Sequence, residues 1–231
     1  IFRREHPKTL KRRIFWEDSV LFLSLRGYSM VQRAKYKRDR KPLIFIVCEG
    51  RNKTERTYFG HFNTRKAPFN LHIENSEATD IASMAKKAAD IFIDNQLDPE
   101  LGDKVYCLVD LDLEQCKYEK YDKAKKKYKN IEIIPSNPCF EIWLLYYFTE
   151  APKVVHSSQR VKEEMAKKLP GYTESMDVVD VANLYDKHWI AIKNSETKNS
   201  RYAEELNILS KNPYTEVATV VKELLRRLNE S

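Results

Sequence analysis

The chain has 231 residues, of which 42% are hydrophobic and 32% are charged, with only five glycines and nine prolines. This composition predicts a globular protein with a sizeable core, and it argues against a linker-rich chain and against an all-β sandwich with many tight turns. The sequence contains no apolar run of membrane-spanning length and no signal peptide, so we expect a cytoplasmic protein that does not enter a membrane.

The net charge of +7 is concentrated near the N-terminus. Residues 1–42 hold 13 Lys or Arg against 4 Asp or Glu, whereas the other 189 residues hold 28 against 30. A basic arm on a near-neutral body suggests an electrostatic partner such as the backbone of a nucleic acid. A solvated tail, or a segment that docks on an acidic partner, explains the same charge. The arm also contains an apolar patch at 14–31, for which helix and hairpin remain open.

The four cysteines lack the spacing of metal ligands. Cys48 and Cys107 fall inside apolar runs, so we expect them to be free, buried thiols rather than disulfide or zinc partners.

Strand and helix patterns alternate between residues 43 and 150. Four strands are predicted, at 43–48, 70–75, 104–109 and 131–134. The first and third are continuous apolar runs, which are typical of strands buried on both faces, and Pro135 is expected to stop the fourth. Helices are predicted at 54–65, 81–92 with Asp80 as N-cap, 117–129 and 140–148. The alternation predicts an α/β domain at 43–152 with a mostly parallel sheet flanked by helices.

Beyond Pro152 the strand signals fade. Helices are predicted at 157–169, 176–193, 200–209 and 215–228. We therefore expect three parts: a basic N-terminal arm at 1–42, the α/β domain at 43–152, and an α-helical C-terminal lobe at 153–231.

Acidic residues follow two of the predicted strands. Glu49 ends the first, and Asp110 and Asp112 end the third. The carboxyl ends of parallel strands meet at one edge of a sheet, where ligands bind, and in an extended stretch Asp110, Asp112 and Glu114 would point to one side. Carboxylates gathered in this way suit Mg²⁺, with Mn²⁺ as the alternative. Glu49 could act as general base or as a further ligand, while the plainer interpretation is that these acids cap helices or face solvent.

Residues at the next strand end offer further candidates. Ser136 and Asn137 are expected at a strand-to-helix turn, where their side chains can cap the helix. Glu141 falls in the first turn of that helix and points either toward the acidic cluster or into a capping box. Glu55 is interpreted as an acid that interacts with a helix dipole.

Three cations lie just after Glu49, namely Arg51, Lys53 and Arg56, and either contact substrate phosphate or face solvent. Trp143 and Trp189 lie on apolar helix faces and are predicted to be core residues. The histidines have no ligand spacing and are interpreted as structural or exposed.

Longer motifs carry a family resemblance. Val47-Cys48-Glu49-Gly50, followed by Val109-Asp110-Leu111-Asp112, resembles the Toprim fold of topoisomerases, bacterial primases and overcoming-lysogenization-defect nucleases. The resemblance narrows to the RloB-like family on the segments 46–50, 53–59, 136–145 (Ser-Asn-Pro-Cys-Phe-Glu-Ile-Trp-Leu-Leu) and 212–215 (Asn-Pro-Tyr-Thr). It covers roughly residues 36–231, and the first 35 residues have no counterpart.

This resemblance implies a Mg²⁺-dependent, Toprim-type endonuclease of prokaryotic defence against mobile elements, often encoded with an ATPase partner. By the same resemblance Glu49, Asp110 and Asp112 take the acidic roles, and Glu141 joins them as a catalytic candidate. The substrate would be DNA or RNA, tRNA included, and a homo-oligomer is left open. The alternative is a regulatory module that binds nucleic acid or the ATPase without cleaving. The chain lacks a Gly-rich phosphate loop of the G-x-x-x-x-G-K type, so ATP hydrolysis would come from another chain.

Overall fold

The computed structural model describes residues 40–50, 53–150 and 152–230, with Lys53 described in its backbone alone. The predicted basic arm therefore lies outside the described residues except for its last three positions. Arg51 and the side chain of Lys53 lie outside them as well.

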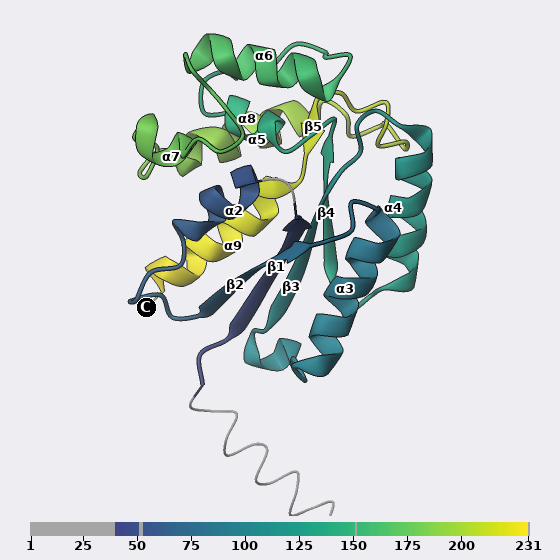
Figure 1. Ribbon diagram of the computed structural model, residues 1–231, viewed down its shortest axis with the longest axis vertical. Coiled ribbons are helices and arrows are strands. Elements are labelled where there is room, and N and C mark those ends of the chain that lie inside the picture. Colours follow the sequence, from purple (N-terminus) through teal and green to yellow (C-terminus); the bar gives the residue numbers. More distant parts are fainter. Residues whose placement is uncertain (1–39, 51–52, 151, 231) are drawn as a thin grey trace, which may run out of the picture. The chain divides into compact units, whose positions relative to one another are not determined.

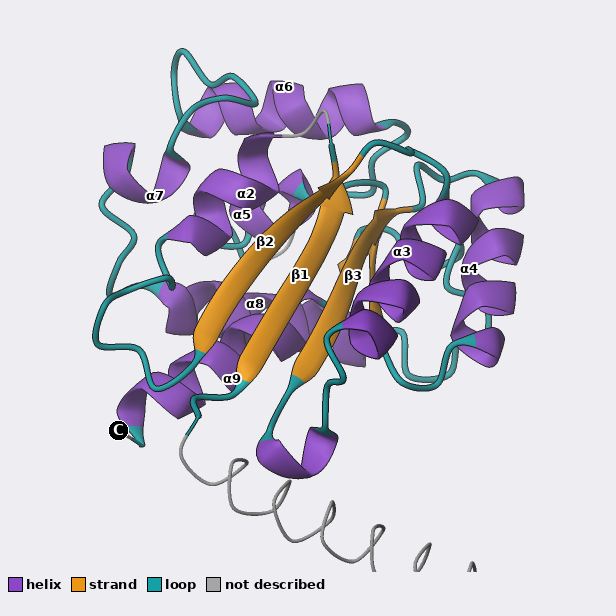
Figure 2. Cartoon of the chain, turned by 60° about the horizontal axis from the view of Figure 1, so that its bottom comes forward, coloured by secondary structure: helices purple, strands orange, loops and turns teal. Residues whose placement is uncertain are grey.

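A five-stranded sheet forms the centre of the described part (Figures 1 and 2). Its strand order is β2-β1-β3-β4-β5. The strands are β1 (Leu43–Glu49), β2 (Asn70–Ser76), β3 (Lys104–Asp110), β4 (Glu132–Asn137) and β5 (Tyr214–Thr215). The first four are parallel and β5 pairs antiparallel with β4, which confirms the predicted α/β fold with a mostly parallel sheet.

Helices cover both faces of this sheet (Figure 2). They are α2 (Lys53–Gly60), α3 (Ile81–Asp94), α4 (Gln115–Lys127), α5 (Glu141–Leu145), α6 (Ser158–Lys168), α7 (Val178–Val181), α8 (His188–Ser200) and α9 (Val217–Asn229), with a short 3₁₀ helix at Pro99–Leu101. α3 and α4 pack on one face, while α2, α5, α8 and α9 pack on the other. None of the helices in the described part is long and apolar enough to cross a membrane.

Both faces of β1 are apolar because its side chains alternate between two cores. Ile44, Ile46 and Cys48 belong to the core that contains α2 and α5. Phe45 and Val47 belong to the core that contains α3 and α4. This two-sided burial explains why the sequence of the strand is a continuous apolar run. Cys48 and Cys107 are free and fully buried, as expected.

The predicted cap of α3 is confirmed. The Asp80 carboxylate accepts a hydrogen bond from the Ser83 backbone N–H at 3.1 Å, which satisfies one of the orphan donors of the first turn.

The predicted stop at Pro135 is wrong, because β4 continues to Asn137 and pairs Asp110 with Ser136. A proline removes a donor but keeps its acceptor, and the Pro135 carbonyl accepts from the Glu216 N–H at 3.0 Å. The strand can therefore run through the proline.

The C-terminal segment differs most from expectation. The single helix predicted at 176–193 is two helices, α7 and α8, and Asn183 between them has a φ of 47° that no α-helix accommodates. The helix predicted at 200–209 is absent, since α8 ends at Ser200 and turns follow. Thr215, expected as the first residue of a helix, instead forms β5 together with Tyr214 and joins the sheet.

The two tryptophans also have different environments. Trp143 is fully buried as predicted, but the core assignment of Trp189 is wrong, because its side chain is 62% exposed.

Candidate acidic site

A small pocket lies at the carboxyl edge of β1 and β3. Glu49 from the end of β1, Asp110 from the end of β3 and Glu55 from the first turn of α2 all line it. Apolar side chains of Ile81, Met84 and Leu108 form the rest of the wall together with Thr79 and Lys117. Its volume of about 10 Å³ is close to the smallest that holds one water molecule. The fold thus brings together Glu49 and Asp110, which are 61 positions apart in the sequence.

The sharp turn after Glu49 depends on glycine. A Cβ atom on Gly50 would lie 2.3 Å from the carbonyl oxygen of Ser76, at the end of β2. Only glycine permits this close approach of two backbones. Gly50 therefore lets the chain leave β1 and return in α2, whose first turn carries Glu55 to the pocket.

Asp110 is the electrostatic centre of the site. Burial raises the pKa of this carboxyl well above its ordinary value, and the charges of Glu55, Glu141, Asp112 and Glu49 raise it further, in that order. Carboxylates from the end of β1, from two helix starts and from the loop after β3 thus act on one group. Ionised Asp110 is costly without a cation in the pocket.

Asp112 is near this cluster but does not line the pocket. Its carboxylate forms an ion pair with Lys117 and accepts a hydrogen bond from the Ser158 hydroxyl. Burial works against the charge of Lys117, but the hydrogen bond to Asp112 together with the charges of Asp112, Glu114 and Asp110 outweighs it, so the pKa of the lysine is raised. The internal cation of the site is therefore committed to Asp112.

The expectation that Asp110, Asp112 and Glu114 share one side is wrong. β3 ends at Asp110, and Asp112 and Leu113 have φ values of 48° and 61°. Side chains alternate strictly only in extended backbone. Glu114 is exposed and precedes α4 without capping it through its side chain.

Glu141 is buried in the first turn of α5, with 5% of its surface exposed. Its carboxylate accepts a hydrogen bond from the Tyr172 hydroxyl at 3.4 Å and lies 4.0 Å from the ammonium of Lys162. Its charge also raises the pKa of Asp110. Glu141 therefore belongs to the acidic cluster, although it does not line the pocket.

The capping role expected for Ser136 and Asn137 is wrong, since the residue before α5, Phe140, has no side-chain cap and both side chains bond elsewhere. The Ser136 hydroxyl pairs with that of Thr215 at 2.9 Å. The amide of Asn137 donates to the Lys211 carbonyl at 3.0 Å and accepts from the Leu113 N–H at 3.3 Å. These bonds tie β4 to the segment before β5 and to the loop after β3.

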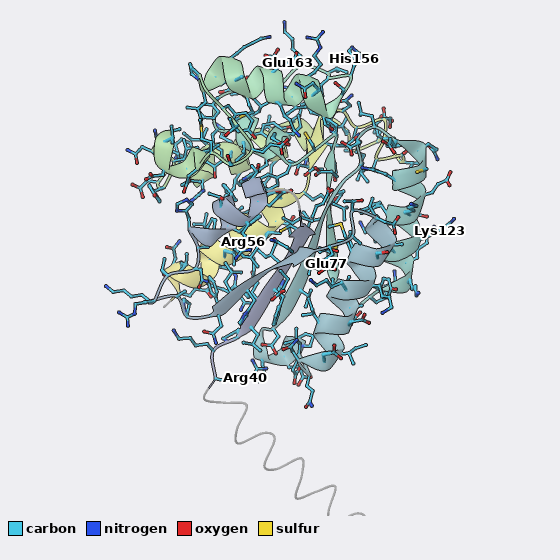
Figure 3. The ribbon with its side chains drawn as sticks, viewed as in Figure 1. Arg40, Arg56, Glu77, Lys123, His156 and Glu163 are labelled. Carbon is cyan, nitrogen blue, oxygen red and sulfur yellow. The ribbon has the colours of Figure 1, made fainter. Side chains whose placement is uncertain are left out.

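The remaining substrate candidates are only partly described. Arg56 is exposed on α2 (Figure 3), while Arg51 and the side chain of Lys53 are outside the described residues.

Two members of the site escaped the sequence analysis. The sequence predicts for Glu55 only an interaction with a helix dipole, but its side chain is 3% exposed and lines the pocket. For Lys117 the sequence predicts only a position in the helix at 117–129. The sequence feature that could have identified Glu55 is its position in the helix that starts shortly after Glu49 and Gly50. The feature that could have identified Lys117 is its position in the first turn of α4, five residues after Asp112.

The carboxylates around the pocket meet the needs of the expected metal only in part. Among the residues with described positions, no three His, Cys, Asp or Glu side chains are grouped so that they could hold an ion, so the expected trio of Glu49, Asp110 and Asp112 is not assembled. Mg²⁺, however, is commonly held by one or two carboxylates, with water and substrate phosphate as the other ligands. Glu49 and Asp110 provide such oxygen donors in one pocket, and the excess negative charge around Asp110 favours a cation.

Comparisons with known proteins agree with the motifs. A search of curated proteins found no match, and a search of solved structures found none. The family model described as RloB-like protein matches residues 44–224, more than three quarters of the chain and the whole span from β1 into α9. The chain belongs to the RloB-like protein family.

Proposed function

We propose that this protein is a Mg²⁺-dependent nuclease that hydrolyses phosphodiester bonds of DNA or RNA, tRNA included. The observation that carries the proposal is the environment of Asp110, a carboxyl surrounded by four others at the edge of a parallel sheet. Such an arrangement is unstable in its charged form, and like-charged groups of this kind cluster at functional sites. Ligand sites of open α/β sheets are found at this same edge.

Glu49 and Asp110 would hold the ion, and Asp112 would join them on release from Lys117. A bound Mg²⁺ or Mn²⁺ would neutralise phosphate charge and lower the pKa of a water molecule that it holds. Glu49 accepts the proton of the attacking water as the new bond to phosphorus forms. The leaving oxygen departs with its electron pair and takes a proton from solvent. Lys117, once freed, offers a positive charge to the phosphate.

The tertiary surroundings suit this chemistry. Ile81, Met84 and Leu108 exclude water from one side of the pocket, and electrostatic interactions are stronger where water is excluded. Lys162 and Tyr172 fix the carboxylate of Glu141 at the border of the cluster.

The Toprim assignment, the role in defence against mobile elements and the ATPase partner belong to the same proposal. They rest on the motifs around Glu49 and Asp110 and on membership of the family. No ATP-binding loop is present in the sequence, so the partner would supply nucleotide hydrolysis.

A second candidate function is a regulatory module that binds nucleic acid or an ATPase without cleaving. The observation in its favour is the ion pair between Lys117 and Asp112, which withholds one carboxylate from the cluster.

One experiment separates the two functions. Labelled DNA and RNA strands, tRNA included, are incubated with the full chain and Mg²⁺, and the products are resolved by length. We expect cleavage that EDTA abolishes and that Asp110→Asn reduces about 100-fold or more, because a lost electrostatic group costs about that much. Asp122→Asn is the matched control, since Asp122 lies on α4 and pairs with Lys126 in solvent. Strands that stay intact would favour the binding module, and cleavage by Asp110→Asn at the full rate would move the active site elsewhere.

A further inference from the structure

A second pocket lies between α6 and the segment 149–156, at the end of the molecule marked by His156 and Glu163 in Figure 3. Its volume is about 440 Å³. Pockets that bind small molecules have volumes of about 300–1,000 Å³, so this one can accommodate a nucleotide-sized group.

The rim of this pocket is cationic. Lys153, Arg160, Lys167 and Lys168 line it, against one carboxylate, Glu164. Glu164 is held by Lys167 at 2.5 Å and Arg160 by Glu163 at 2.7 Å. Lys153 and Lys168 are exposed, and neither forms an ion pair with any of the described acids. The hydrogen bond from Lys167 lowers the pKa of Glu164, and the charges of Lys153 and Lys168 lower it further, but neither of these two lysines is held in an ion pair with it. Four cations against one carboxylate leave the rim with a net positive charge.

The floor of the pocket is apolar. It consists of Leu145, Pro152, Val154 and Val155, and His156 stands beside it. Val154 is 59% exposed, so its side chain is open to contact with a bound group. A surface of this kind accepts the flat face of a base, and histidine rings commonly stack on unpaired bases.

α6 connects this pocket to the acidic site. Ser158 and Lys162, one helical turn apart, contact Asp112 and Glu141. Arg160 and Glu164, also one turn apart, line the pocket from a different face of the helix. Two positions along a helix correspond to about 200° around its axis at 3.6 residues per turn. The acidic cluster and the pocket therefore lie against nearly opposite faces of the same helix.

We propose that this pocket binds an unpaired nucleotide of a single-stranded nucleic acid, with the base on the apolar floor and its phosphates on Lys153 and Lys168. The strand continues over α6, so that a phosphate a few nucleotides away reaches the acidic cluster. This second statement rests on the proposed nuclease function, whereas binding in the pocket does not. A duplex keeps its bases stacked and paired, so it fills the rim but not the floor.

Binding is measured by fluorescence anisotropy with a labelled single strand of about 12 nucleotides, the scale of the site of a single-strand-binding domain. EDTA is present throughout, so that cleavage cannot contribute. The test variant of the full chain is Lys153→Glu with Lys168→Glu. The matched control is Lys123→Glu with Lys127→Glu, which makes the same charge change on the exposed side of α4, away from the pocket (Figure 3).

We expect the pocket variant to bind about tenfold or more weakly and the control variant to stay within about twofold of the parent. The slope of log affinity against log salt should also fall by about 0.7 for each phosphate that the variant no longer binds. Val154→Asn should weaken binding of the single strand and leave a duplex of the same length unaffected, since it adds no charge to the rim and only an unpaired base reaches the floor. Thermal unfolding verifies that these surface variants remain folded.

Other outcomes overturn the inference. Equal weakening by the two charge variants would mean a general effect of net charge, and unchanged binding by the pocket variant would mean that the pocket is not a site. Competition by a free mononucleotide as strong as by the strand would identify a nucleotide site instead. If the pocket variant binds normally while Asp110→Asn still abolishes cleavage, the pocket inference fails and the nuclease proposal stands.

Discussion

Lys117 forms an ion pair with Asp112 while its side chain lines the same pocket as Asp110. A single lysine thus lies between two acids that the sequence presents as partners in one metal site. Its ammonium compensates part of the negative charge of the site, and Asp110 is one of the acids that raise its pKa. The lysine and a bound cation therefore compete for the same negative charges.

Lys117→Met should make the protein more dependent on a divalent ion. Without an ion we expect a stability loss of about 1 kcal/mol, the scale of a partly exposed ion pair. With MgCl₂ the melting temperature of the variant should rise more than that of the parent, because the site has lost its internal cation. Differential scanning fluorimetry over a MgCl₂ series measures both effects. Lys120→Met, which removes the exposed pair with Asp80, is the control. An identical response of parent and Lys117→Met to Mg²⁺ would contradict the competition.

Asp110→Asn should stabilise the metal-free protein at neutral pH. The folded-state pKa of Asp110 is raised above its ordinary 3.8, so the folded protein binds a proton more tightly than the unfolded chain. The stability that this tighter proton binding contributes is lost as pH rises from about 3.8 toward the raised pKa of Asp110. The loss is about 1.4 kcal/mol for each pH unit between the two values. The variant avoids this cost and should melt several degrees higher at pH 7. Urea unfolding at pH 4 and pH 7 measures the difference, which should be smaller at pH 4. Asp122→Asn should show no such gain.

Much of the fold is encoded in local patterns. The continuous apolar runs of β1 and β3 reflect burial on both faces, and Asp80 marks the start of α3 through its own hydrogen bond. The shared edge of Glu49 and Asp110 follows from parallel strands alone. These features depend on near neighbours in the sequence or on a general property of sheets.

The features that escaped prediction depend on tertiary contacts. Asp112, with its positive φ, lies in a loop that two backbone hydrogen bonds hold in place. The Leu111 N–H donates to the Ser136 carbonyl in β4, and the Asp112 N–H donates to the Pro138 carbonyl just after β4, both at 2.9 Å. β5 has only two residues and exists because β4 lies beside it. Trp189 has the periodicity of a core residue, yet its side chain is 62% exposed in the described part of the chain. None of these relationships leaves a local pattern in the sequence.

Asn137→Ala tests whether the Ser-Asn-Pro motif serves the fold or the substrate. The variant leaves the Lys211 carbonyl and the Leu113 N–H without the Asn137 amide. We expect a loss of about 1–3 kcal/mol in the free energy of unfolding, the cost of buried polar groups left unsatisfied. Chemical denaturation measures it. Affinity for a nucleic-acid strand, measured on the folded variant, should be unchanged. Lost affinity with full stability would instead make Asn137 a substrate contact.

His188 should make the protein acid-sensitive above pH 4. It is buried, its Nδ1 lies 2.5 Å from the Tyr147 hydroxyl, and Tyr147 pairs in turn with Tyr58 at 2.6 Å. Burial and, to a lesser degree, the charge of His61 lower the pKa of His188 from 6.5 to about 4. Between these values the unfolded chain binds a proton that the folded protein does not. Stability should therefore fall as pH falls, by up to about 1.4 kcal/mol per pH unit.

Urea unfolding from pH 7 to pH 4.5 tests this expectation. His188→Gln, less stable at pH 7 for loss of the ring, should show a flatter dependence on pH. His72→Gln is the control, since His72 is exposed and stacks on Phe45. A parent curve without slope in this range would show that His188 accepts a proton in the folded state.

Deletion of residues 1–40 should separate general affinity from site chemistry. The remaining described unit starts at Lys41 and is close to neutral, with acids at its proposed reaction site. Counterion release by the basic arm should therefore supply most of the affinity that does not depend on sequence. We expect the truncated chain to bind nucleic acid more weakly and with a flatter salt dependence, by roughly 0.7–0.9 of slope for each phosphate that the arm had neutralised. The Mg²⁺-dependent rise in melting temperature should persist, because the acidic cluster is retained.

Anisotropy titrations over a salt series measure the affinity. Unchanged affinity and slope would instead assign the arm to contact with a protein partner, and its apolar patch at 14–31 would then be the first segment to mutate.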